Sequence, residues 1–218
     1  MTHTPVVDTH VHVVPGGERD GEATRDPYEI WEYGIKDDIE ICELAGTLDQ
    51  VTDAMRAADA DHFVVVNMFV PLTELDKMSG PDGDVPTLET HREELRDRLV
   101  AFNSWALDVA ADRSDMTVFV AMDPTVLGGQ DGARHLRWSR ERGALGFKIH
   151  PVTQRFLPDD PRMDDVYAMC EELEMGVIAH AGASRSGPEW AEPRAFATVL
   201  DAHPQLKLIL AHLGGGRW

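Results

Sequence analysis

Short apolar runs rich in β-branched residues alternate with longer amphipathic stretches along the whole chain. The short runs predict buried strands, and the longer stretches, with apolar residues every three or four positions, predict helices. Strands are expected at residues 6–14, 63–70, 117–122, 146–150, 177–180 and 206–212. Helices are expected at about 47–60, 87–112, 131–142, 164–175 and 193–202. This alternation is typical of βα units arranged around a parallel sheet.

Two polar stretches interrupt the pattern, each directly after a predicted strand. Residues at about 15–46 and 71–86 are rich in Gly, Pro and Asp. Both are long for βα turns, so we interpret them as loop insertions over one end of the sheet. Because a complete eight-stranded barrel takes about 250 residues, we expect a (β/α)8 barrel of the TIM type that is incomplete, with strands 1–6 present and strands 7–8 missing. An open α/β sheet is the alternative.

Composition narrows the class of protein further. A length of 218 residues favours one domain over residues 1–218. The formal net charge of −19 argues against a nucleic-acid partner, and the bias towards Asp and Arg suggests a high-salt cytoplasm. No apolar run is long enough to span a bilayer, and no secretory signal pattern stands at the N-terminus, so we expect a cytoplasmic protein without a membrane partner. The two cysteines, Cys42 and Cys170, are too far apart in sequence to indicate a disulfide framework or a thiolate zinc site.

Histidines gather where the predicted strands end. His10 and His12 are two residues apart on the first strand, so their side chains are expected on one face. His150, His180 and His212 each stand at the carboxyl end of a later predicted strand, and His150 is a candidate for binding substrate or for supporting the metal ligands. In parallel α/β proteins this edge carries the active site. The pattern therefore indicates a metal site with imidazole ligands, although an HxH pair by itself is more often an exposed pair on an edge strand.

Three charged residues could support such a site. Lys148 precedes His150 by two residues and is expected on the same face, either in a buried ion pair, as a partner of a substrate carboxylate, or as a carbamate. Asp8 has the same parity as His10 and could accept a hydrogen bond from an imidazole, or be a solvated residue. Arg185 follows the fifth strand and could bind a substrate carboxylate, but pairing with a neighbouring acid is the simpler interpretation.

Four motifs, VDTHVH, GFKIHP, VIAHAG and PQLKLILAHLGGG, resemble in sequence and order those of the amidohydrolase-related metal-dependent hydrolases. This family includes aminocarboxymuconate semialdehyde decarboxylase and related decarboxylases. The resemblance runs from residue 6 to 216 and implies a (β/α)8 barrel. It also implies a divalent metal ion, usually Zn²⁺, held by His10, His12 and His180, with His212 as general acid/base. The last ligand in the family is an aspartate at the end of strand eight, which this sequence does not reach.

We therefore expect a hydrolase that cleaves a C–N or C–O bond of a small, carboxylated organic substrate with a metal-activated water. One alternative is non-oxidative decarboxylation by the same ligands. Another is a catalytically inactive, incomplete barrel whose open edges drive formation of a homo-oligomer.

Overall fold

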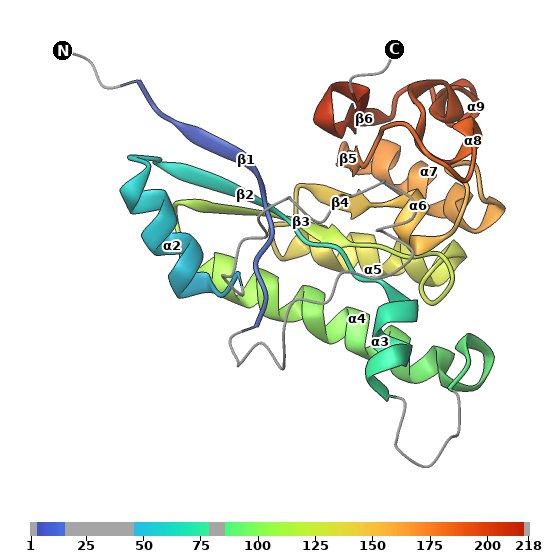
Figure 1. Ribbon diagram of the computed structural model, residues 1–218, viewed down its shortest axis with the longest axis horizontal. Coiled ribbons are helices and arrows are strands. Elements are labelled where there is room, and N and C mark those ends of the chain that lie inside the picture. The colour runs from blue at the N-terminus through green and yellow to red at the C-terminus, as the bar shows by residue number, and fades with distance from the viewer. Residues whose placement is uncertain (1–3, 16–45, 79–85, 216–218) are drawn as a thin grey trace.

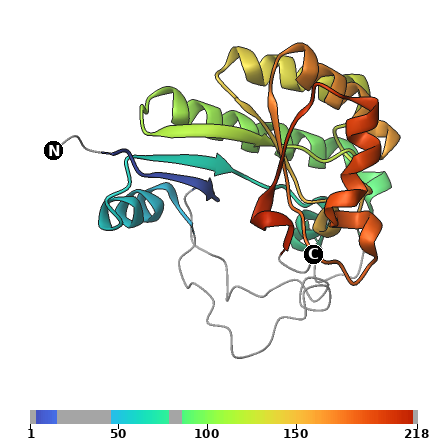
Figure 2. The ribbon, with the colours of Figure 1, turned by 90° about the horizontal axis from the view of Figure 1, so that it is seen from above.

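The computed structural model describes residues 4–15, 46–78 and 86–215. In these ranges the strands form one parallel sheet in the order β1-β2-β3-β4-β5-β6. The strands are β1 (Val7–Val11), β2 (His62–Val66), β3 (Met116–Ala121), β4 (Gly146–Ile149), β5 (Gly176–Ala179) and β6 (Lys207–Leu210). The sheet curls along its width (Figure 2), so the described strands make the first six strands of an incomplete βα barrel, as expected.

The helices that follow the strands are α2 (Leu48–Ala57), α3 (Pro71–Met78), α4 (Leu88–Ala111), α5 (Gly129–Glu141), α6 (Pro151–Gln154), α7 (Asp164–Glu172), α8 (Pro188–Ala191) and α9 (Ala197–Ala202). Among them, α4, α5 and α7 cover the convex side of the sheet (Figures 1 and 2). Short 3₁₀ segments lie at Pro161–Met163, Pro193–Phe196 and Ala211–Gly215. Thr47 and Thr87 cap α2 and α4, each accepting a backbone N–H three residues on, which explains why these helices begin there.

The period-two alternation of each strand separates two apolar layers. Val65, Val118 and Phe147 belong to the main core, between the sheet and its outer helices. A second, smaller cluster consists of Val66, Phe119, Ile178 and Ala211. Because neighbouring residues on a strand point to opposite faces, this second cluster lies on the concave face. These apolar side chains therefore lie on the concave face, beneath the carboxyl ends of the strands.

A pair of glycines at the amino-terminal ends of β4 and β5, Gly146 and Gly176, lets these two strands approach closely. A Cβ built on Gly146 would lie 1.8 Å from the carbonyl oxygen of Gly176 and 2.6 Å from the ring of Phe119. Both distances are far inside van der Waals contact. The position therefore requires glycine, and the Phe119 ring occupies the space that a side chain there would need.

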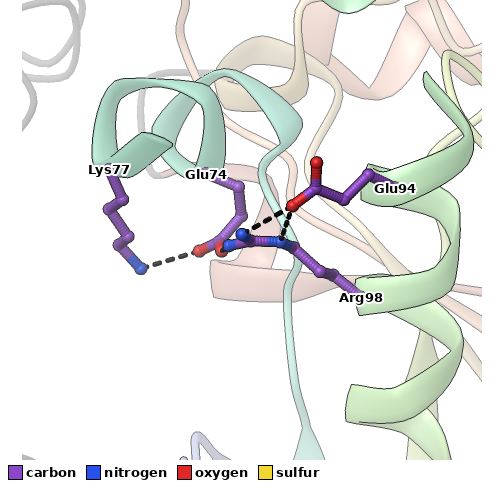
Figure 3. Close-up of polar contacts among 4 residues, drawn as sticks. All are labelled: Glu74, Lys77, Glu94 and Arg98. Carbon is purple, nitrogen blue, oxygen red and sulfur yellow. Dashed lines mark hydrogen bonds and ion pairs between the residues drawn. The ribbon is translucent and has the colours of Figure 1, made fainter. Parts of the chain in front are cut away.

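The stretch at 71–86 was expected to be a loop, but its first half is helix α3. Proline is favoured in the first turn of a helix, where Pro71 stands, and Leu75 is buried four residues later. Glu74 of α3 accepts hydrogen bonds from Lys77 at 2.7 Å and from Arg98 of α4 at 3.5 Å (Figure 3). Arg98 also binds Glu94, one turn earlier on α4, so ion pairs join the two helices.

The remaining parts of the expected insertions, residues 16–45 and 79–85, lie outside the described residues. Within the described ranges, the helices are too short or too polar for any of them to traverse a bilayer.

The last strand ends earlier than expected. We expected it to continue to His212, but β6 ends at Leu210 and the chain turns through left-handed conformations. The φ angles of His212, Leu213 and Gly214 are 58°, 52° and 71°. Left-handed backbone is costly for residues with a Cβ. His212 therefore reaches its position from a strained turn, not from a strand.

Candidate functional site

Four imidazole rings from the two edges and the fifth strand of the sheet meet at its carboxyl end. The ring centroids are 5.2 Å apart for His10 and His12, 4.9 Å for His10 and His212, and 5.0 Å for His180 and His212. His10 and His180 are half-buried, whereas His12 and His212 remain exposed at the rim. The curl of the sheet thus brings β1 next to residues that follow β5 and β6.

These spacings suit a shared ion. Two imidazoles that bind one tetrahedral metal ion through nitrogens at about 2.0–2.1 Å have ring centroids about 5 Å apart. In the described ranges, however, no three His, Cys, Asp or Glu side chains already surround one point as a formed metal site would. The ring spacings therefore suit a shared ion, although the described side chains do not form a complete site. Because neutral imidazole is a good ligand for zinc, copper, iron and nickel, the donor set fits a divalent transition metal.

The surroundings keep these rings unprotonated at neutral pH. Partial loss of surrounding water, with the charge of Lys148 as a further cause, lowers the pKa of His10 and of His12 to about 4. Loss of water and the neighbouring His212 lower the pKa of His180 to about 3. The pKa of His212 is also lowered, by loss of water and then by Lys148. Unprotonated imidazole is the form that can bind a metal or accept a proton.

Lys148 lies within this cluster, as its position on β4 predicted. Its side chain is 1% exposed, and its Nζ lies 3.3 Å from Nε2 of His10. Burial lowers the pKa of the Lys148 ammonium to about 8. Lys148 thus presents a buried cation to the same space that the imidazoles face.

His150 joins the cluster by stacking on His180. The two ring centroids are 3.7 Å apart and the ring planes differ by 15°. His150 is also the N-cap of α6, since its Nδ1 accepts the backbone N–H of Thr153 at 3.3 Å. Burial, followed by the neighbouring His180 and Lys148, lowers the pKa of His150 well below its usual value.

Asp8 differs from the expectation. The β1–β2 pairing runs Val7 to His62 and Asp8 to Phe63, and then shifts, so that Val11 pairs with Val65. This bulge places one additional residue of β1 between the two pairings, which reverses the alternation of faces. The prediction that Asp8 and His10 share a face is therefore wrong. Instead, Oδ1 of Asp8 accepts the backbone N–H of His10 at 3.1 Å, inside the bulge.

Arg185 lies in the loop after β5, on the same side of the sheet as the histidines, with its side chain exposed. It is therefore at the correct edge of the sheet.

Two buried amides at this edge were not identified from the sequence. Gln154 donates from Nε2 to the carbonyl oxygens of Phe69 and Met122, both at 2.8 Å, and accepts the N–H of His150 at 2.6 Å. Asn67 accepts the N–H of Val13 at 2.8 Å, one residue after His12. A single amide has no periodic signature, and only the four-residue spacing from His150 to Gln154 indicates a cap.

A curled parallel βα sheet with histidines at its carboxyl edge defines a barrel-type α/β protein with a site at the usual active face. Comparison with known proteins identifies the family. A family model described as amidohydrolase matches residues 7–218, and the chain therefore belongs to the amidohydrolase family. Among curated proteins, no sequence matches this chain.

Solved structures show the same fold at low sequence identity. A protein named amidohydrolase II shares 15% identity with a TM-score of 0.60, covering 96% of this chain and 67% of that one. A 5-carboxyvanillate decarboxylase from Novosphingobium aromaticivorans, solved with manganese and 4-hydroxy-3-methoxy-5-nitrobenzoic acid, shares 17% identity with a TM-score of 0.59. That match covers 96% of this chain and 65% of that one. The chain thus spans about two thirds of the length of these structures.

Proposed function

We propose that the chain is a metal-dependent hydrolase that cleaves a C–N or C–O bond of a small, carboxylated organic substrate. The observation that carries this proposal is the spacing of the imidazole rings at the carboxyl edge of the sheet, where the pairs His10–His12, His10–His212 and His180–His212 have centroids between 4.9 and 5.2 Å apart. Membership of the amidohydrolase family supports the same reaction class.

In this proposal His10, His12 and His180 hold the metal ion. Their lowered pKa values leave the ring nitrogens available as ligands at neutral pH. Zinc is the ion we favour, because it is commonly bound by imidazole in catalytic sites with three protein ligands. A bound zinc ion would supply a reactive water, because its charge lowers the pKa of coordinated water from 15.7 to about 7.

His212 is the proposed general acid/base. Its ring is unprotonated at neutral pH, because its pKa is lowered, and it lies about 5 Å from the rings of both His10 and His180. It can therefore take a proton from the attacking water and deliver it to the leaving nitrogen or oxygen. The exposed edge of His212 leaves this ring accessible to a substrate that enters from solvent.

Lys148 is the proposed partner of a substrate carboxylate. A buried ammonium without an anionic partner is costly, and Lys148 contacts imidazole, not a carboxylate, in the described cluster. A substrate anion would provide the missing charge. Arg185, in the loop after β5, is a second candidate for the same task at the rim.

Non-oxidative decarboxylation is the alternative reaction. The structural similarity to a carboxyvanillate decarboxylase favours it as the second candidate. The same four imidazoles and Lys148 would then bind the carboxylate that leaves as carbon dioxide. The two reactions differ in products, because hydrolysis consumes water and decarboxylation releases carbon dioxide.

The test combines metal analysis with product analysis. The purified chain is dialysed against metal-free buffer, given one equivalent of Zn²⁺, and analysed for bound metal beside a His10→Ala, His12→Ala double variant and a His91→Ala control. His91 lies on α4 and bonds only to its own first turn, at Thr87 and Thr90, among the described contacts. We expect about one ion per chain in the parent and control, and none in the double variant.

The metal-loaded parent is then incubated with small carboxylated amides, lactones and aromatic acids. Mass spectrometry of the products, together with measurement of released carbon dioxide, separates the two reactions. Hydrolysis products that disappear in the double variant support the proposal. Carbon dioxide without hydrolysis would establish the decarboxylase, and absence of bound metal from the parent would refute both.

A further inference from the structure

His150 belongs to the histidine cluster, but its geometry differs from that of the other rings. Three pairs, His10 with His12, His10 with His212 and His180 with His212, have ring centroids about 5 Å apart. His150, in contrast, lies 3.7 Å from His180 with nearly parallel planes. Two rings bound to one tetrahedral ion diverge from it and are about 5 Å apart. A parallel stack at 3.7 Å is therefore not the arrangement of two ligands of one ion.

The hydrogen bond at the start of α6 is a second observation against His150 as a metal ligand. Nδ1 of His150 accepts the backbone N–H of Thr153, so Nδ1 carries no hydrogen. In neutral imidazole the other nitrogen, Nε2, then carries the hydrogen and has no lone pair for a metal. The capping bond thus selects the tautomer in which His150 is a hydrogen-bond donor and not a ligand.

Gln154 holds this arrangement in place. Its Oε1 accepts the N–H of His150, while its Nε2 binds carbonyl oxygens of Phe69 and Met122, which follow β2 and β3. The amide is 3% exposed and uses both of its donors and its acceptor oxygen. The backbone of His150 is therefore held, through Gln154, to the ends of two neighbouring strands, β2 and β3, and its ring is held by the bond from Thr153.

We propose that His150, held by Gln154, is a positioning residue that does not bind the metal and orients the ring of His180 by stacking on it. The part assigned to His180 rests on the proposed function. The stack restricts rotation of the His180 ring about its side-chain bonds, so that the ring is oriented before an ion arrives. Partners that orient a metal ligand typically change metal affinity by about 10- to 100-fold.

The first test compares His150→Asn with His180→Asn in the full 218-residue chain, with His91→Asn as control. Asparagine retains an N-cap acceptor for Thr153 but removes the stacked ring. Affinity for Zn²⁺ is measured by competition with a chromophoric chelator. We expect His150→Asn to retain one ion per chain at an affinity about 10- to 100-fold lower, and His180→Asn to lose stoichiometric binding. Equal loss in both variants, or unchanged affinity in His150→Asn, would overturn the proposal.

The second test determines the tautomer of His150 in the metal-free chain. Two-dimensional ¹⁵N NMR of the imidazole groups in the metal-free chain should show His150 with its hydrogen on Nε2. In Gln154→Leu the ring signals of His180 should shift, although the contacts described for Gln154 do not include His180. A hydrogen on Nδ1 of His150, or unshifted His180 signals in a folded Gln154→Leu chain, would refute the proposal. If the parent chain binds no zinc, the proposed function fails, and this NMR measurement still decides the role of His150.

Discussion

Gln154 joins three strand ends through one buried side chain, and its replacement by leucine tests how much that junction contributes to stability. Leucine has a similar size but can neither donate nor accept. The variant loses one hydrogen bond of 2.6 Å and two of 2.8 Å. Each contributes about 1 kcal/mol net, so we expect the free energy of unfolding to fall by about 3 kcal/mol. This is a large part of the 5–15 kcal/mol that stabilises a typical domain.

Urea unfolding followed by circular dichroism measures this loss. With a slope of about 2–3 kcal/mol per molar urea, the midpoint should fall by about 1 M at an unchanged slope. Gln130→Leu is the matched control, because Gln130 is exposed in the first turn of α5. If Gln154→Leu and Gln130→Leu differ by less than about 0.5 kcal/mol, the junction is not stabilising and the reasoning is wrong.

Three further changes test other features of the structure. Asp123 is fully buried, and burial raises its pKa to about 7. The folded state therefore binds the proton of Asp123 more tightly than the unfolded state does, and the free energy of unfolding should decrease from about pH 4 to pH 7. Asp123→Asn should remove this decrease, and parallel pH profiles of the variant and the parent in thermal unfolding would contradict it. Leu213 is 94% exposed and its φ is 52°. Leu213→Gly should therefore raise the free energy of unfolding in urea by about 0.5–1 kcal/mol. A decrease would show that the left-handed turn is not strained. Arg98→Ala breaks the pairs with Glu74 and Glu94 and should cost less than about 1 kcal/mol, an effect that should shrink in 1 M salt; a cost independent of salt would indicate lost packing instead.

The strands were predictable because a parallel sheet covered by helices needs nearly continuous apolar runs. β3, β4 and β5 lie within one or two residues of their expected positions. Residues 71–78 were misassigned, since the Gly, Pro and Asp of the following segment outweighed the spacing of Leu72 and Leu75. Local composition describes such a segment poorly where helix formation depends on packing and on ion pairs with α4.

The carboxyl edge was predictable as the location of the candidate site, because parallel strands place their ends together. The face of the sheet on which Asp8 lies was not predictable, because the bulge in β1 reverses the alternation and depends on how β1 pairs with β2. The left-handed turn at His212 was equally invisible, since neither His212 nor Leu213 favours that conformation. In both cases the strand departs from its period-two alternation for a reason that the local sequence does not contain.

The sequence by itself determined the class of fold, the positions of the strands along the chain and the residue types available for chemistry, since apolar periodicity and the ends of strands are local properties. Only the tertiary structure decided which imidazoles are neighbours. It placed His10 about 5 Å from His212, although 202 positions separate them, and it stacked His150 on His180. The reason is physical: the curl of the sheet, the β1 bulge and the hydrogen bonds of Gln154 arise from contacts between distant segments, which no single stretch of sequence encodes.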